Sequence, residues 1–169
     1  MSEAQGDYQV RFEWGAAGAA QVAQDADVLV WVDQLGEQPA PEAPAGVAVV
    51  HGTIQSSAAI GAWSLARQEA LGGRFRIAVV AAGEPRADGS LRFAVEDLLA
   101  AGAVIEEIAA LGIDHQSPEA AAAASAHTGL RRATRHLLSA SVTARAAGGI
   151  RLDLDPVDAV TVLRESAPA

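Results

Sequence analysis

The side chains best suited to chemistry lie in residues 83–97, where the loop GEPRADGSLR leads into the adjacent Glu96 and Asp97. The loop joins flexible glycines to acidic and basic groups, and it follows an apolar stretch typical of a buried strand. Ligands of open α/β sheets bind at the carboxyl ends of strands, so this loop is predicted to lie at a binding edge. Neighbouring helical side chains point about 100° apart, so the two carboxyl groups are not expected to serve one site. We expect one to be a solvated charge favoured by the helix dipole and the other to hydrogen-bond the loop.

Two further positions follow predicted strands. Asp33 comes directly after the run DVLVWV, where a carboxylate suits a metal or catalytic group and equally suits a loop cap. Residues 51–57, HGTIQSS, precede a predicted helix and could cradle an anion on backbone N–H groups, although N-capping is the commoner role of such residues. His51 is a candidate acid or base, but the sequence pairs no nucleophile with it. The sequence contains no P-loop, GxGxxG, HExxH or GxSxG motif.

Strands and helices that would position these groups alternate along the chain. Predicted strands cover residues 8–12, 27–32, 47–50, 74–82, 151–155 and 159–163, and predicted helices cover residues 13–24, 56–71, 93–111, 117–127 and 128–138. Residues 34–46 hold three prolines and are predicted to be a surface loop or extended tether, since they cannot continue a strand or helix. This order predicts an α/β fold with a mostly parallel sheet and helices on both faces, in a single domain spanning residues 1–169.

Composition limits the classes of partner. The chain has 169 residues, half of them apolar, and its 12 basic and 21 acidic residues give a formal net charge of −9. Such a surface repels phosphate backbones and anionic lipids, so we expect no nucleic acid and no membrane as a partner. A small anionic substrate would need a metal ion, a helix N-terminus or a few arginines beside it. The absence of cysteine excludes disulfides and thiolate chemistry, and with no evident signal peptide we expect a cytoplasmic protein.

Residues 81–108, AAGEPRADGSLRFAVEDLLAAGAVIEEI, resemble the signature of the 2-phosphosulfolactate phosphatases, the ComB family. That family carries a similar strand and glycine-containing loop, followed by Ser-Leu, Glu-Asp and an Ala-Gly pair in the helix. Residues 10–20, 27–33 and 47–63 and the tail DAVTVL are also similar to family segments. The resemblance therefore covers most of the chain in order.

The resemblance implies a three-layer α/β/α fold with a mostly parallel or mixed central sheet. It also implies a Mg²⁺-dependent phosphatase acting on a small anionic phosphate ester, since the family hydrolyses 2-phospho-3-sulfolactate to sulfolactate. Magnesium would offset the repulsion between an acidic protein and a phosphate ester. By this resemblance Asp33 and Glu84 are the candidate catalytic residues, Gly83, Gly89 and Ser90 the candidate substrate-binding residues, and Glu96 and Asp97 the candidate metal ligands, with loop organisation an alternative role for the last two.

The chain departs from the family directly after Asp33. Family members carry there a Leu-Arg/Ser-Ala/Phe-Thr-Thr type segment that opens a helix, and later an Asn-Gly-Thr/Ser loop, whereas this chain has the Pro-rich residues 34–46. Phosphoryl transfer depends on positioned charge, so the alternative is a catalytically inactive relative that acts as a binding or assembly protein. Loss of a strand and a helix would leave a sheet edge or an apolar face uncovered, so we expect a homo-oligomer.

Overall fold

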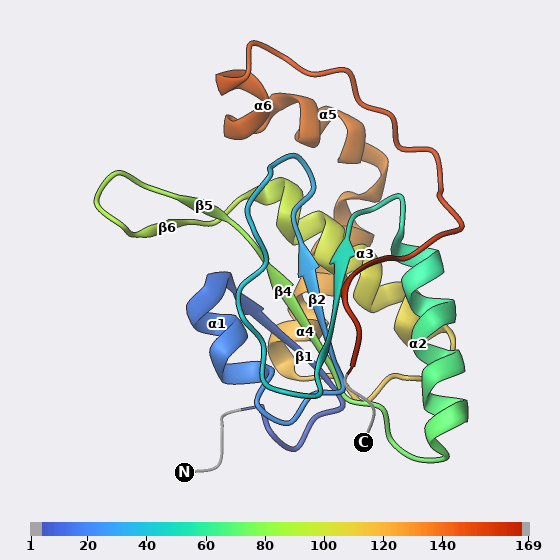
Figure 1. The fold of residues 1–169 in the computed structure, drawn as a ribbon. Coiled ribbons are helices and arrows are strands. Elements are labelled where there is room, and N and C mark those ends of the chain that lie inside the picture. The colour runs from blue at the N-terminus through green and yellow to red at the C-terminus, as the bar shows by residue number, and fades with distance from the viewer. Residues whose placement is uncertain (1–4, 167–169) are drawn as a thin grey trace.

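A five-stranded mixed sheet forms the centre of the computed structural model, which describes residues 5–166 (Figure 1). The strands are β1 (Val10–Trp14), β2 (Val28–Val32), β3 (Ala48–Gly52), β4 (Ile77–Ala81) and β7 (Thr161–Arg164), in the order β1-β4-β2-β3-β7. The first four of this order pair in parallel, and β7 runs antiparallel to β3. A separate hairpin joins β5 (Glu84–Pro85) to β6 (Leu91–Arg92). The predicted α/β fold with a mostly parallel or mixed sheet is confirmed.

Helices cover both faces of the sheet. They are α1 (Gly15–Val22), α2 (Ser57–Leu71), α3 (Val95–Ala110), α4 (Pro118–Leu130), the 3-10 turn η1 (Arg131–Ala133), α5 (Thr134–Ala140) and α6 (Val142–Ala146). Side chains alternate along each strand, so Val28 and Val30 of β2 face the layer of α2, α3 and α4, whereas Leu29 and Trp31 face α1. The three layers of the expected α/β/α arrangement are therefore present. No helix within residues 5–166 combines the length and the apolar character needed to cross a bilayer.

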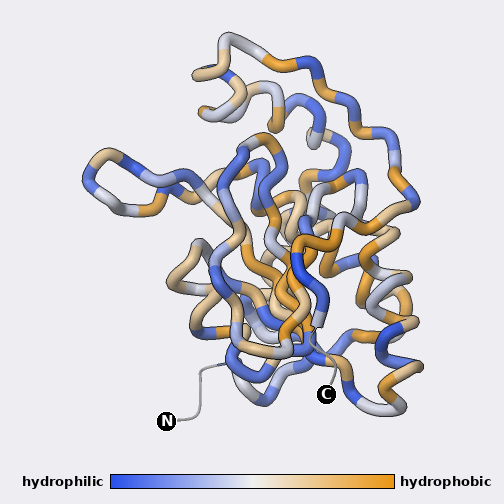
Figure 2. The backbone as a smooth tube through the Cα atoms, viewed as in Figure 1, coloured by the Kyte–Doolittle hydropathy of each residue, from blue (hydrophilic) through white to orange (hydrophobic). Residues whose placement is uncertain are grey.

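The central strands β2 and β4 are buried along their whole length. Both consist of apolar residues only, and hydrophobic residues are concentrated in these strands at the centre of the molecule (Figure 2). Parallel strands covered on both faces have this composition because neither face meets water. The continuous apolar runs in the sequence therefore predicted the position of the core correctly.

The Pro-rich residues 34–46 contain no helix or strand, as predicted, but they are part of a layer. Ala40 and Ala43 pack on the same side of the sheet as α1, and the indole nitrogen of Trp31 donates to the backbone oxygen of Gln38 at 3.0 Å. This segment connects the parallel neighbours β2 and β3, a connection that usually holds a helix. Residues 34–46 therefore cover a part of this sheet face that no helix covers.

The expected late strand at residues 151–155 is absent, which corrects the prediction. Exposed and half-buried residues do alternate there, as in a strand. However, the free edge of β3 is taken by β7, so this extended segment has no strand beside it. The helix expected over residues 128–138 is also divided, because α4 runs to Leu130 and η1 separates it from α5.

Strand β1 lies at the other edge of the sheet, where its outward backbone groups are bonded without a full neighbouring strand. The side-chain amide of Gln5 donates from Nε2 to the backbone oxygen of Phe12 at 2.9 Å, and its Oε1 accepts from Phe12 N at 3.0 Å. At the start of the strand, Val10 N donates to the oxygen of His115, and Ser117 N donates to the oxygen of Val10. This edge is therefore closed to strand addition at these positions.

Candidate functional site

The carboxyl ends of β2 and β4 meet the beginning of α3, and four carboxyl groups gather there. Asp33 follows β2, Glu84 follows β4, and Glu96 and Asp97 lie in the first turn of α3; we call these four residues the acidic cluster. The chain leaves β2 over the α1 face and leaves β4 toward α3 on the opposite face, which is the topology that opens a ligand crevice in α/β sheets. The β5–β6 hairpin and α5–α6 lie at this same end of the sheet (Figure 1).

Asp97 holds the ends of two neighbouring strands together. Its Oδ1 accepts from the backbone nitrogen of Gln34 at 2.8 Å, directly after β2, and its Oδ2 accepts from that of Gly83 at 2.9 Å, directly after β4. The side chain is 2% exposed, so both bonds are shielded from water. The expectation that one carboxylate of the Glu96–Asp97 pair binds the loop is confirmed for Asp97.

Asp33 caps the loop that follows it. Its Oδ1 accepts from Gly36 N at 2.8 Å and its Oδ2 accepts from Gln38 N at 2.6 Å. A Cβ on Gly36 would lie 2.5 Å from Oδ1, so the loop folds closely over the carboxylate. Of the two roles that the sequence left open for Asp33, the structure contains the loop cap, while a catalytic role stays a prediction.

Glu96 is buried, and its carboxylate has no bonding partner among the described residues. It is 1% exposed, and neither carboxylate oxygen has a hydrogen-bond partner within residues 5–166. The expectation of a solvated charge beside Asp97 is therefore wrong, because the start of α3 is covered on this side and the preceding Ala94 is also 1% exposed. A carboxylate removed from water without donors or a cation is costly, so this group is suited to meeting a positive ion.

Two of the four carboxyl groups, those of Asp97 and Glu84, have raised pKa values. Desolvation is the largest cause for Asp97, and together with the charges of Asp33 and Glu96 it raises the pKa to about 7, against the opposing bonds from Gln34 and Gly83. The pKa of Glu84 is also raised, first by burial and then by the charge of Asp33, with the Arg92 guanidinium acting in the opposite direction. The site is therefore short of positive charge at neutral pH.

The site meets only some of the requirements for binding a divalent cation. Within residues 5–166, no three Asp, Glu, His or Cys side chains converge closely enough to enclose a metal ion. Mg²⁺ is usually held by only one or two carboxylates and completes its shell with water and substrate phosphate oxygens. Glu96 is the member of the acidic cluster whose oxygens have no partner within residues 5–166, although they are buried, whereas Asp33 and Asp97 already accept two backbone bonds each.

The three candidate substrate-binding residues lie in the same loop but in different settings. Gly83 has φ +64°, and a Cβ there would lie 2.8 Å from the backbone oxygen of Arg92, so this turn requires glycine. Gly83 and Gly89 both line a cavity of about 340 Å³. Ser90 is exposed at the end of the hairpin, where its Oγ donates to Asp88 at 2.7 Å. No described hydrogen bond joins Gly89 or Ser90 to the acidic cluster, and their role in binding a substrate stays a prediction.

Sequence reasoning missed the contribution of Gln34. Its Oε1 accepts from Ile54 N at 2.7 Å and its Nε2 donates to Gln55 at 2.9 Å, so it joins the loop after β2 to the loop after β3. Through these two bonds, residues 51–57 are connected to the site as hydrogen-bond partners of Gln34. The only signal for this role was the position of Gln34 directly after a strand-ending aspartate.

Compared with known protein families and with curated protein sequences, the chain shows no significant match. The resemblance to the 2-phosphosulfolactate phosphatases therefore stays a prediction from the sequence segments named above.

Proposed function

We propose that the chain is a Mg²⁺-dependent hydrolase of small phosphate monoesters, the activity implied by its resemblance to the 2-phosphosulfolactate phosphatases. The observation that carries this proposal is Glu96, whose buried oxygens lack partners within residues 5–166, at the edge where α/β sheets bind ligands. A cation beside Glu96 would neutralise a costly charge. It would also attract a phosphate ester to a protein with a net charge of −9.

The residues of the acidic cluster would take different roles in this reaction. Glu96 would hold the cation, which when bound supplies the positive charge that a phosphoryl group needs. Asp33 and Asp97 keep the loops after β2 and β4 in place through their backbone bonds. Glu84 is only half-buried and has a raised pKa, so it is the carboxylate suited to accept a proton from the attacking water. The water oxygen bonds to phosphorus, the ester P–O bond breaks, and the departing alcohol takes up a proton.

Phosphate release from a panel of small phosphate esters, including 2-phospho-3-sulfolactate, tests the activity. We expect turnover that requires Mg²⁺ and falls at least a hundredfold in Glu84→Gln and Glu96→Gln. Glu37→Gln is the matched control, because Glu37 is exposed in the neighbouring loop and forms no described ion pair. The absence of turnover on every ester, with and without Mg²⁺, would refute the hydrolase proposal.

Thermal unfolding tests the metal separately from turnover. A cation that binds only the folded chain stabilises it by about 2.7 kcal/mol at a hundred times its dissociation constant. We expect Mg²⁺ to raise the melting temperature of the native chain and of Glu37→Gln, but not that of Glu96→Gln. An equal rise in Glu96→Gln would remove Glu96 from the site.

A non-catalytic binding or assembly protein is the second candidate. It is favoured by the bonding of Asp33 and Asp97, since two of the four carboxylates already serve the loops. This candidate predicts neither phosphate release nor a Mg²⁺-dependent rise in melting temperature.

A further inference from the structure

A groove lined by aromatic rings lies at the β1 edge, apart from the acidic cluster. Its volume is about 500 Å³, and we call it the aromatic groove, after Phe12, Trp14 and Phe93. Leu98 of α3 adds to its apolar wall, and Glu13 and Glu119 are its charged residues. The volume is that of a pocket for a small organic molecule.

The rings form a connected row. Trp14 stacks on Phe93 with ring centroids 4.7 Å apart, and Phe12 meets Trp14 edge-on at 5.8 Å. Phe93 is 67% exposed, although a side chain of this size and character is normally covered. Stacking on Trp14 holds one face of this ring in place and leaves the rest of it open to a ligand.

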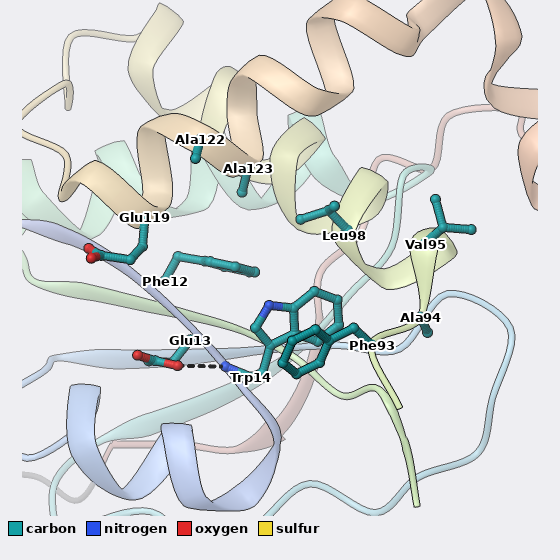
Figure 3. A pocket seen from close by; sticks show the side chains of 10 residues that line it. All are labelled: Phe12, Glu13, Trp14, Phe93, Ala94, Val95, Leu98, Glu119, Ala122 and Ala123. Carbon is teal, nitrogen blue, oxygen red and sulfur yellow. Dashed lines mark hydrogen bonds between the residues drawn. The ribbon is translucent and has the colours of Figure 1, made fainter. Parts of the chain in front are cut away.

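The charges that line the groove within residues 5–166 are all negative. In Figure 3 the carboxyl group of Glu119 lies on the Phe12 side, with Phe93 on the opposite side, whereas the carboxyl group of Glu13 lies across β1 toward α1, where its Oε2 is 3.3 Å from the position of a Cβ on Gly18. Glu13 accepts a hydrogen bond from Trp14 N at 3.2 Å, but neither glutamate forms an ion pair in the described part of the chain. No described arginine or histidine lines the groove. Its potential is therefore set by the Glu119 carboxylate and by the negative faces of the rings.

We propose that the aromatic groove binds a small cationic amphiphile, an aryl- or alkylammonium compound, with its apolar part on Trp14, Phe93 and Leu98. Its ammonium group lies near Glu119. Aromatic faces attract ammonium groups, and the Glu119 carboxylate adds a charge attraction that a neutral or anionic ligand lacks. The net charge of −9 favours the same class of ligand. This site shares no residue with the acidic cluster, so it is independent of the hydrolase proposal.

Titration of the ¹⁵N-labelled chain with benzylammonium, followed by NMR, tests the proposal. Benzyl alcohol is the matched neutral probe and phenylacetate the anionic one. We expect saturable shifts of the Trp14 indole and of the Phe93 and Leu98 amides with benzylammonium. Benzyl alcohol should bind about threefold to thirtyfold more weakly, the range expected for a cation–π contact, and phenylacetate more weakly still.

Variants locate the binding. Phe93→Ala should weaken benzylammonium binding several-fold while the chain stays folded, because this ring is mostly exposed. Glu119→Gln should weaken it about twofold to fivefold, with less dependence on salt. Glu69→Gln, an exposed site on α2, is the control and should bind as the native chain does. Equal affinity for benzyl alcohol, or unchanged binding in both Phe93→Ala and Glu119→Gln, would overturn the proposal. So would light scattering that shows a dimer dispersed by Phe93→Ala, since the groove would then be an interface between copies.

Discussion

Asp33 and Asp97 differ from Glu84 and Glu96 in what their oxygens contact. The two aspartates each accept two backbone N–H groups, from four different loop positions. Glu84 has only a 3.5 Å contact from Gln38, and Glu96 has no partner among the described residues. All four are carboxylates at one end of one sheet, so charge and position did not separate them. Whether a carboxylate holds the loops in place or stays available for a ligand depends on the backbone N–H groups beside it. Single substitutions test this difference.

The largest expected effect is that of Asp97→Ala. Removing this carboxylate leaves the N–H groups of Gln34 and Gly83 buried without acceptors, at about 1–3 kcal/mol each. We therefore expect a loss of about 2–5 kcal/mol in urea unfolding at pH 5, where Asp97 is largely protonated and mutual repulsion is small. Asp88→Ala, in the exposed hairpin turn, should cost less than about 1 kcal/mol. Equal losses of stability in Asp97→Ala and Asp88→Ala would contradict the structural role of Asp97.

Next in size is the dependence of stability on pH. The pKa of Asp97 rises from its ordinary value of 3.8 to about 7 in the folded chain, so the folded state holds a proton that the unfolded state has lost. Stability from this group is complete below about pH 4 and is lost as the pH rises toward 7. Between pH 5 and pH 8 the loss should be about 2–3 kcal/mol. Urea unfolding at a series of pH values should show this fall in the native chain and a flatter profile in Asp97→Asn. A profile that rises over this range and is identical in both would contradict it.

The smallest expected effect is a gain. Glu96→Gln keeps the shape of the side chain and removes a negative charge that has no partner among the described residues and that raises the pKa of Asp97. Without Mg²⁺ we expect this variant to gain about 1–2 kcal/mol at pH 8, with a smaller gain at pH 5. Thermal unfolding at both pH values measures it. A loss of stability at pH 8 would show that Glu96 has a favourable partner, and the comparison between aspartates and glutamates would fail.

The sequence was sufficient for most of the fold because the core strands are chemically uniform. Residues 28–32 and 77–81 are apolar throughout and have no alternative to burial, and their position determined both the sheet and the edge where Asp33 and Glu84 stand. The first turn of α4 also followed from local chemistry, since Ser117 accepts from Ala120 N at 3.1 Å with Pro118 as the first helical residue. The prediction of a strand at residues 151–155 failed because alternating polar and apolar residues indicate only that one side of the segment is covered. Whether a strand lies beside them depends on where β7 pairs.

The candidate site could be located from the sequence but its bonding could not. Glycines and carboxylates after strands indicated the right edge, yet nothing in the order of residues states that Asp97 reaches the backbone at Gln34, 63 positions earlier. The burial of Glu96 likewise depends on how the start of α3 is covered. Long-range contacts of this kind are decided by packing, which local pattern does not encode.

The amide of Gln5 closes the β1 edge with two hydrogen bonds, a task for which most sheets use another strand, a bulge or a charged residue. The bonds of Val10 to His115 and Ser117 close the start of the strand, so the resistance of the protein to edge-to-edge aggregation depends partly on the chemical integrity of this one amide. Deamidation would replace the Nε2 donor by a carboxylate oxygen facing the carbonyl of Phe12, and an attraction would become a repulsion. The released edge could then pair with the same edge of another molecule. Slow aggregation of an aged sample would begin at this glutamine, whose bonding partner Phe12 also lines the aromatic groove.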